Sequence, residues 1–391
     1  MPPLQEIQKL APLNLLQDSL KHLNGETGAN RCHTRTCQIA ASNDWEAICC
    51  WLSEYIAKSS TYRAYQKESE RLLLWCLIEK KKALSSLTRQ DFEEYIHFLS
   101  DPLPAHVWCG PKGSRASKRH VSSWRPFVGP LSPTAQMTAL TILDSLFQYL
   151  LAASYLEFNP LSLMRRKASR HQRQQAQAIK LHERILEDED WQLLLNTLQD
   201  LTETNARERD EKARLRFLVA ILFLLGLRIH ELETHGWNAF KQIHGDWWFF
   251  VAGKGDKPGK IPVNPALLDE VIRFRLHLNL PPLPACDETI PLIPSWHHQH
   301  ALGARQMGYL LKQLAVKAAM SIADNPSRAN KLKCFSPHWL RHLSASMQDR
   351  VGIRFGHIKA NHRHESDETT RRYVHAIDKE RHDDMKKLQF F

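Results

Sequence analysis

The chain has 391 residues, of which 43% are hydrophobic, so it is long enough for two or three domains with packed cores. Its formal net charge of +11 and its pI of about 9.3 favour binding to a polyanion. Nucleic acid is the first candidate and a membrane surface the second, and the alternative is a basic soluble protein without such a partner. We expect a cytoplasmic protein, because no apolar run follows a basic N-terminal segment and the longest one, residues 217–227, is too short for a bilayer.

Residues 1–42 form a leader that begins with an amphipathic helix pattern. Leucine and isoleucine recur every three or four residues between residues 4 and 23, and the glycines of Gly25-Glu26-Thr27-Gly28 end the pattern. An isolated amphipathic helix has to dock on its own chain or on a partner subunit. The remainder of the leader has no such pattern and is predicted to be a loop.

The eight cysteines are scattered along the chain and are expected to be reduced. Cys32, His33 and Cys37 lie close together, but no second ligand pair follows at zinc-finger spacing, so we expect no metal site. The sequence Gly253-Lys254-Gly255 lacks the spacing of a phosphate-binding Walker loop, so we expect neither a nucleotide-binding role nor a cofactor.

Residues 43–165 are expected to form an all-helical unit, because apolar residues recur at helical spacing after each of several capping sequences. These capping sequences are Asn43-Asp44, Ser59-Ser60-Thr61, Thr88-Arg89-Gln90-Asp91 and Ser132-Pro133-Thr134. Residues 101–131 interrupt the pattern with five prolines and three glycines. The cations of this insertion suit contacts with DNA phosphates, although a solvated insertion without a partner fits as well. The predicted contacts are Lys112, Arg115, Lys118 and Arg119.

Residues 166–180 are polar and basic and form the predicted linker between two domains. The cations around its start suit the strap of a clamp that closes around DNA, and a plain basic linker is the alternative. The predicted DNA-binding residues here are Arg165, Arg166 and Lys167.

The second domain, residues 181–391, is predicted to be mainly helical with a small antiparallel sheet. The apolar residues 215–227 form a buried helix that ends at Arg228, where an arginine is unfavourable unless it meets an anion or a carboxylate. We predict two strands, the aromatic residues 247–251 and the short run 261–263, which are joined by a turn that is rich in glycine and lysine.

Four elements follow one another in this domain: an arginine after a buried apolar run, a lysine on a hairpin, a His-x-x-Arg sequence and a late tyrosine. Together they suit cleavage of a phosphodiester, because cations stabilise the charge that develops on the phosphate and a tyrosine oxygen can attack it. Taken singly, each has a structural alternative; Arg228 and Glu231, for example, are spaced to form an ion pair.

In this order the elements resemble the tyrosine recombinase family, which includes phage-type integrases and Xer-like recombinases. The resemblance covers residues 181–380, whereas residues 43–165 share only the layout of the family's core-binding domain. It implies a helical core-binding domain and a mixed α/β catalytic domain that form a clamp around DNA. The motifs that carry it are Gly226-Leu227-Arg228-Ile229-His230-Glu231-Leu232, Gly253-Lys254-Gly255-Asp256-Lys257, His338-Trp339-Leu340-Arg341-His342 and residues 364–375.

The resemblance also implies a role for each residue. Tyr373 attacks the phosphate and becomes joined to a DNA 3′-phosphate, while Arg228 and Arg341 hold the non-bridging oxygens. Lys254 protonates the leaving 5′-oxygen, and His338 takes or returns the tyrosine proton. His364 donates a hydrogen bond to the phosphate. Two further lysines of the hairpin, Lys257 and Lys260, are expected to contact DNA.

Two histidines compete for the place of the family's second active-site histidine. His357 follows a glycine, as in the family, but it lies sixteen residues before Tyr373. His364 lies nine residues before Tyr373 and 23 after Arg341, at the spacing of the family, so we assign this place to His364. It is preceded by Arg363, where the family often has a glycine that can adopt a positive φ.

The expected function is site-specific recombination of double-stranded DNA, which integrates or excises a mobile element without metal or ATP. The family resemblance implies a homotetramer with a dimer on each site, and an accessory DNA-bending factor is a further candidate partner. We therefore expect a nucleoid-associated protein. The alternatives are a type IB DNA topoisomerase, which uses similar chemistry, and a DNA-binding protein without catalysis.

Overall fold

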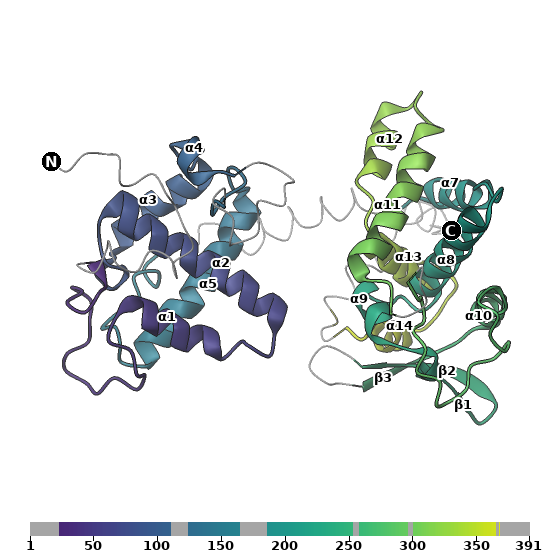
Figure 1. Ribbon diagram of the computed structural model, residues 1–391, viewed down its shortest axis with the longest axis horizontal. Helices are drawn as coiled ribbons and strands as arrows, with labels where there is room; N and C mark the ends of the chain where they lie inside the picture. The colour runs from purple at the N-terminus through teal and green to yellow at the C-terminus, as the bar shows by residue number, and fades with distance from the viewer. Residues whose placement is uncertain are drawn as a thin grey trace, which may run out of the picture. The chain divides into compact units, whose positions relative to one another are not determined.

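The computed structural model describes residues 23–110, 124–164, 186–252, 258–295, 300–364 and 367. The chain divides into two compact units between Lys167 and Ala168, and each unit has its own hydrophobic core (Figure 1). Within the described ranges, no helix combines the length and the hydropathy that are needed to cross a bilayer.

The first unit is helical, and three of the four predicted capping sequences cap a helix with a side chain, whereas the helix that begins at Ser59 has no side-chain cap. The side chain of Asn43 accepts a hydrogen bond from the Glu46 N–H, Ser132 accepts one from Ala135, and Thr88 and Asp91 form a complete capping box. The helices are α1 (Asp44–Ser53), α2 (Ser59–Trp75), η3 (Cys76–Lys80), η4 (Leu84–Ser86), α3 (Arg89–Ser100), α4 (Ala105–Trp108) and α5 (Pro133–Ala152).

The proline-rich insertion between α3 and α5 is anchored at both ends. Trp108 and Phe127 are buried, and the Phe127 N–H donates to the Trp108 carbonyl oxygen over 3.1 Å. The Arg71 guanidinium lies 4.2 Å from the centre of the Phe127 ring and donates to the Pro126 carbonyl oxygen over 2.9 Å. The two ends of the insertion are therefore packed on the helical unit, while its predicted DNA-binding residues lie outside the described residues.

Part of the predicted leader packs on the helical unit. The Asn30 side chain exchanges two hydrogen bonds with the backbone of Phe158, at 2.9 and 3.0 Å. The Cys32 N–H donates to the Tyr155 carbonyl oxygen over 3.1 Å. These bonds tie residues 23–42 to the end of α5 and the loop that follows it, whereas most of the amphipathic pattern lies outside the described residues.

The second unit contains one three-stranded antiparallel sheet in the order β1-β2-β3. Phe249 of β2 pairs with Phe240 of β1 and with Ile261 of β3, and all three side chains are buried in the core. The strands β2 and β3 confirm the predicted hairpin, and β1 is an additional strand. The strands are β1 (Phe240–Ile243), β2 (Asp246–Ala252) and β3 (Pro258–Pro262).

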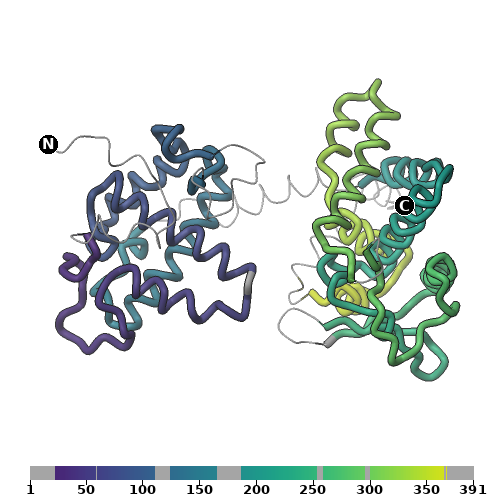
Figure 2. The backbone as a smooth tube through the Cα atoms, in the orientation of Figure 1, coloured from purple at the N-terminus to yellow at the C-terminus, as the bar shows by residue number. Residues whose placement is uncertain are grey.

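Helices surround α8, whose apolar side chains form the centre of the core of this unit. α8 contacts α7, α10, α11 and α13, and α14 contacts β3, as the yellow α14 and the teal hairpin show in Figure 2. The helices are α7 (Asp188–Gln199), α8 (Ala206–Leu224), α9 (Ile229–Thr234), η6 (Trp237–Ala239), α10 (Pro265–His277), α11 (Ala304–Met320), α12 (Pro326–Lys333), α13 (Pro337–Arg350) and α14 (Phe355–His362).

One detail of the predicted buried helix is wrong. α8 ends at Leu224, the chain turns at Gly226 with a φ of +59°, and Arg228 is the residue that precedes α9. Arg228 therefore opens a short second helix and does not close the buried one. Glycine permits the turn because a side chain at this φ would be strained.

Candidate active site

The turn before α9 places Arg228 at the surface of the second unit. The Glu231 carboxylate accepts the Arg228 backbone N–H over 2.7 Å and its guanidinium Nη1 over 3.2 Å. Glu231 is buried, whereas the Arg228 side chain is 35% exposed. The predicted ion pair therefore exists, and it leaves part of the guanidinium open to a ligand.

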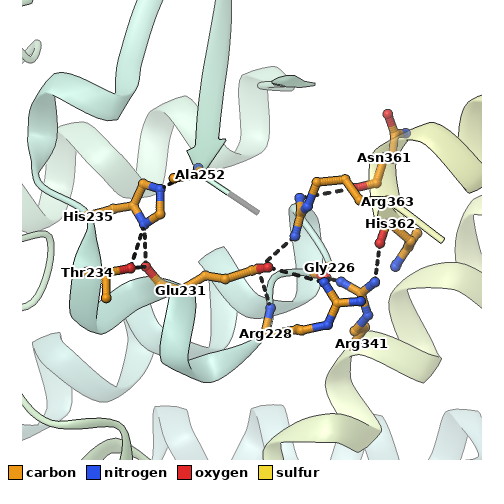
Figure 3. Close-up of polar contacts among 10 residues, drawn as sticks. All are labelled: Gly226, Arg228, Glu231, Thr234, His235, Ala252, Arg341, Asn361, His362 and Arg363. Carbon is orange, nitrogen blue, oxygen red and sulfur yellow. Dashed lines mark hydrogen bonds and ion pairs between the residues drawn. The ribbon is translucent and has the colours of Figure 1, made fainter. Parts of the chain in front are cut away.

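Arg341 lies on the first turns of α13 and is 2% exposed. Its two Nη atoms donate to the carbonyl oxygens of Gly226 and His362. These bonds join the turn before Arg228 to the end of α14 (Figure 3). A guanidinium carries five N–H donors and keeps its charge. Arg341 can therefore hold these two backbone segments together and still attract an anion.

α14 ends with a left-handed residue that leads into His364. Arg363 has a φ of +50°, the conformation for which the family's glycine was expected. Its Nη2 donates to the Glu231 carboxylate over 2.7 Å, and its side chain is 12% exposed. Figure 3 shows Glu231 between Arg228 and Arg363. The departure from glycine therefore keeps the positive φ and adds an ion pair.

The buried Glu231 carboxylate is ionised by its arginine neighbours. Burial by itself raises the pKa of this carboxyl group, but the charge of Arg363 opposes it. The Arg228 N–H and the charges of Arg228 and Arg341 add to this opposition, so the pKa lies below its ordinary value. The carboxylate is thus a fixed negative charge inside a group of guanidiniums.

The pKa of His364 is lowered to about 3, first by burial and then by the charges of Arg341, Arg228, Arg363 and His338. The imidazole is therefore neutral at physiological pH and can act as a hydrogen-bond donor. These interactions also place His364 near three other predicted catalytic residues, Arg228, His338 and Arg341.

The other histidines of the motifs differ in their surroundings. His338 is exposed at the start of α13, and its ring centre lies 4.3 Å from that of the buried His342. The rival histidine His357 is exposed on the first turn of α14. The fully buried His362 has a pKa well below its ordinary value because of burial and of the charge of Arg341.

We expect the neutral state of His364 to make the stability of the protein depend on pH. Its pKa is about 6.5 in an unfolded chain and about 3 in the folded protein, so only the unfolded chain binds the proton between these values. This histidine's contribution is complete above about pH 6.5 and decreases by about 1.4 kcal/mol for each pH unit below it. Urea unfolding at pH 7 and pH 5 measures the change.

The control for this expectation is His364→Gln, which cannot take up the proton. The wild-type protein should lose about 2 kcal/mol more than the variant between pH 7 and pH 5. Equal losses in the two proteins would show that His364 does not carry the pH dependence.

His235 was not predicted, although it links the arginine motif to the lysine hairpin. Its Nδ1 lies 2.6 Å from the Glu231 carbonyl oxygen, and its Nε2 accepts the Ala252 N–H over 2.9 Å (Figure 3). The neutral tautomer with a proton on Nδ1 satisfies both bonds. Both partners are backbone atoms, so no side-chain motif in the sequence indicates this contact.

Several predicted site residues lie outside the described residues. They are the catalytic residues Lys254 and Tyr373 and the DNA-binding residues Lys112, Arg115, Lys118, Arg119, Arg165, Arg166, Lys167 and Lys257. Ala252 is the last described residue before the segment that carries Lys254. The exposed Lys260 is described, and its Nζ lies 4.4 Å from the centre of the Trp248 ring. This places one predicted DNA-binding cation on the surface of the sheet.

No protein-family model and no curated protein matches the chain. Its structure is similar to that of the XerH site-specific recombinase bound to a palindromic difH substrate in a post-cleavage complex. The identity is 16%, the match covers 89% of this chain and 85% of that one, and the TM-score is 0.56. A lambda integrase dimer bound to a COC′ core site matches at 13% identity over 85% and 77% of the two chains, with a TM-score of 0.52.

The chain has the tyrosine recombinase fold. A third example, the Tn1549 transposon integrase in complex with transposon right end DNA, matches at 15% identity over 88% and 99% of the two chains, with a TM-score of 0.50. The fold class expected from the sequence, mainly helical with a small antiparallel sheet, is thereby confirmed. At these identities the similarity establishes the tyrosine recombinase fold, and the chemistry depends on the residues of the site.

Proposed function

We propose that this protein is a site-specific DNA recombinase that cleaves and rejoins duplex DNA through a covalent 3′-phosphotyrosine intermediate. The observation that carries the proposal is a tyrosine recombinase fold in which Arg228 and Arg341 lie beside the buried Glu231 carboxylate. The buried His364 interacts with both of these arginines and with His338. These residues come from α9, α13 and the end of α14, and they are the described members of the predicted catalytic set.

The proposed reaction is an in-line displacement at phosphorus. The Tyr373 oxygen forms a bond to the phosphorus, and the bond to the 5′-oxygen breaks. The tyrosine proton passes to His338, and Lys254 gives a proton to the leaving 5′-oxygen. The phosphotyrosine bond conserves the energy of the phosphodiester, so a new 5′-hydroxyl can reverse the step without ATP.

The arginines and His364 act on the phosphate in this proposal. The guanidiniums of Arg228 and Arg341 hold the non-bridging oxygens and oppose the negative charge that grows on them. His364 donates a hydrogen bond to the same group, as a neutral imidazole can over the whole physiological pH range. These fixed charges stabilise the transition state more than the ground state, which is the condition for catalysis.

DNA is the proposed partner of both units. The cations of the insertion, of the linker and of the β2–β3 segment contact phosphates, with the exposed Lys260 as the described example. The solved neighbours named above include an integrase dimer on DNA. We propose that four copies of this chain act together, two on each site, to integrate or excise a mobile element, with an accessory DNA-bending factor as a further partner.

A suicide substrate tests the proposed function. The substrate is duplex DNA that carries the ends of the mobile element and a nick beside the cleavage site, so that the cut strand diffuses away. We expect a protein–DNA adduct that survives SDS, that peptide mass spectrometry assigns to Tyr373 and that is absent in Tyr373→Phe. An adduct that persists in Tyr373→Phe would assign the nucleophile to another residue.

The same DNA separates recombination from its alternatives. A recombinase requires paired sites to exchange strands, whereas a type IB topoisomerase relaxes supercoiled DNA of almost any sequence as a monomer. A protein that binds the sites in a gel-shift assay but forms no adduct would be a DNA-binding protein without catalysis.

A further inference from the structure

The residue that precedes His364 is an arginine in a left-handed turn. A non-glycine residue with a positive φ costs about 1 kcal/mol, and Arg363 has a φ of +50°. The family often has a glycine at this position, and a glycine avoids this cost. The contacts of the Arg363 side chain show what the arginine adds.

The Arg363 side chain crosses from the end of α14, past β3, to α9. Its Nη2 donates to Glu231 Oε2 over 2.7 Å, and its Nη1 lies 3.4 Å from the Asn361 carbonyl oxygen. Gly259 of β3 makes room for it, since a Cβ atom there would lie 2.7 Å from Arg363 Cδ. The side chain is 12% exposed, so it is enclosed between these three elements.

The Glu231 carboxylate therefore forms ion pairs with two arginines, Arg228 and Arg363. Its Oε2 accepts Arg363 Nη2 and the Arg228 backbone N–H, which leaves Oε1 for Arg228 Nη1 at 3.2 Å. Without Arg363, the negative charge of the buried carboxylate would be balanced mainly by Arg228. A buried carboxylate attracts the nearest cation strongly, and such a pairing competes with an incoming phosphate.

The charge of the site follows from these contacts. Among the described residues, the guanidiniums of Arg228, Arg341 and Arg363 lie around the Glu231 carboxylate, so the net charge of these four groups is +2. A phosphodiester carries one negative charge, and attack by a tyrosine oxygen raises the negative charge on the phosphate to about two in the transition state. Removal of Arg363 would lower the net charge of these groups by one, so they would oppose less of the negative charge that develops in the transition state.

We propose that Arg363 is a positioning residue that neutralises Glu231 and so leaves the Arg228 guanidinium for the scissile phosphate. The inference rests on the proposed function. It adds a third arginine to the phosphate site of this protein, which acts through Glu231 without contact with the DNA. It also gives a reason for an arginine at a position whose backbone favours glycine.

The test compares two substrates for the wild-type protein and for Arg363→Met, which keeps most of the aliphatic side chain and loses the charge. One suicide substrate has an ordinary phosphodiester at the cleavage site, and the other has a methylphosphonate, in which a neutral methyl group replaces one charged oxygen. We expect Arg363→Met to form the adduct about 10- to 100-fold more slowly on the phosphodiester and at nearly the wild-type rate on the methylphosphonate. Arg363→Lys should regain most of the rate.

A matched control is available on α10. Glu270 also receives two arginines, Arg216 over 2.8 Å and Arg273 over 2.6 Å, and the Arg273 side chain is 55% exposed. Arg273→Met removes one arginine from a shared glutamate outside the site, so it should leave both cleavage rates unchanged. If Arg363→Met does not fold, Arg363→Gly relieves the left-handed residue and carries the same expectation.

The outcomes separate the two proposals. Equal losses on both substrates would reduce Arg363 to a structural residue, and no loss on the phosphodiester would also overturn the inference. In both cases the wild-type adduct still supports the proposed function. A wild-type protein that forms no adduct on either substrate would overturn the proposed function and, with it, the inference.

Discussion

Replacement of Arg341 by alanine is expected to slow DNA cleavage on the order of 10²-fold or more and to destabilise the protein by about 4 kcal/mol. Arg341 is 2% exposed, and its guanidinium donates to the carbonyl oxygens of Gly226 and His362. Alanine would leave both oxygens without this donor in the interior, and each such loss costs about 1–3 kcal/mol. Urea unfolding of the full chain and single-turnover cleavage of the suicide substrate measure the two effects.

Arg228→Ala is the comparison that separates these effects. The Arg228 side chain is 35% exposed, and Glu231 keeps its bond to Arg363 when the Arg228 side chain is removed. We therefore expect a similar loss of cleavage but a destabilisation below about 1 kcal/mol. If Arg341→Ala unfolded at the same urea concentration as the wild-type protein, the two carbonyl contacts would not have the structural importance that we assign to them.

The parts of the fold that could be predicted depend on local signals. Asn43, Ser132 and the pair Thr88 and Asp91 cap their helices with their own side chains, so a few adjacent residues contain the whole interaction. β1 was missed because it has four residues, although His244 and Gly245, with φ values of +53° and +90°, form the two-residue turn of a hairpin.

The four described members of the proposed catalytic set were selected from the sequence because they stand in motifs whose order and spacing resemble a known family. What positions them could not be predicted in the same way. Arg341 donates to the backbone of residues 115 and 21 positions away, and His235 contacts the backbone of Ala252. Any residue type provides a carbonyl oxygen, and all except proline provide an N–H, so such partners leave no pattern in a sequence.

Arg363, which replaces the family's glycine, also shows that a sequence does not reveal long-range contacts. The sequence indicates that an arginine stands where a glycine is common, and this raises the question of the turn geometry. The φ of +50° shows that the turn is retained, and the 2.7 Å bond to Glu231 shows the compensating contact. That contact joins residues 132 positions apart in the chain, so it can be identified only from the folded structure.

Gly226→Ala is expected to destabilise the protein by about 3 kcal/mol and to slow cleavage on the order of 10²-fold. Gly226 has a φ of +59°, and a Cβ atom there would lie 2.3 Å from His362 Cε1. His362 is fully buried, and its carbonyl oxygen accepts from Arg341, so a displaced His362 would also displace the guanidinium. The same unfolding and cleavage measurements apply.

Gly352→Ala separates backbone strain from this steric effect. Gly352 also has a positive φ, +80°, but a Cβ atom there would meet no atom within 4 Å. Its alanine variant should therefore lose only about 1 kcal/mol and keep its cleavage rate, because the left-handed backbone is the sole cost. Equal effects of the two substitutions would mean that the contact between Gly226 and His362 has no part in holding Arg341. A larger effect at Gly226 in both measurements would instead place this glycine among the residues that shape the phosphate site, since the atoms nearest to its position belong to His362, whose carbonyl oxygen accepts from Arg341.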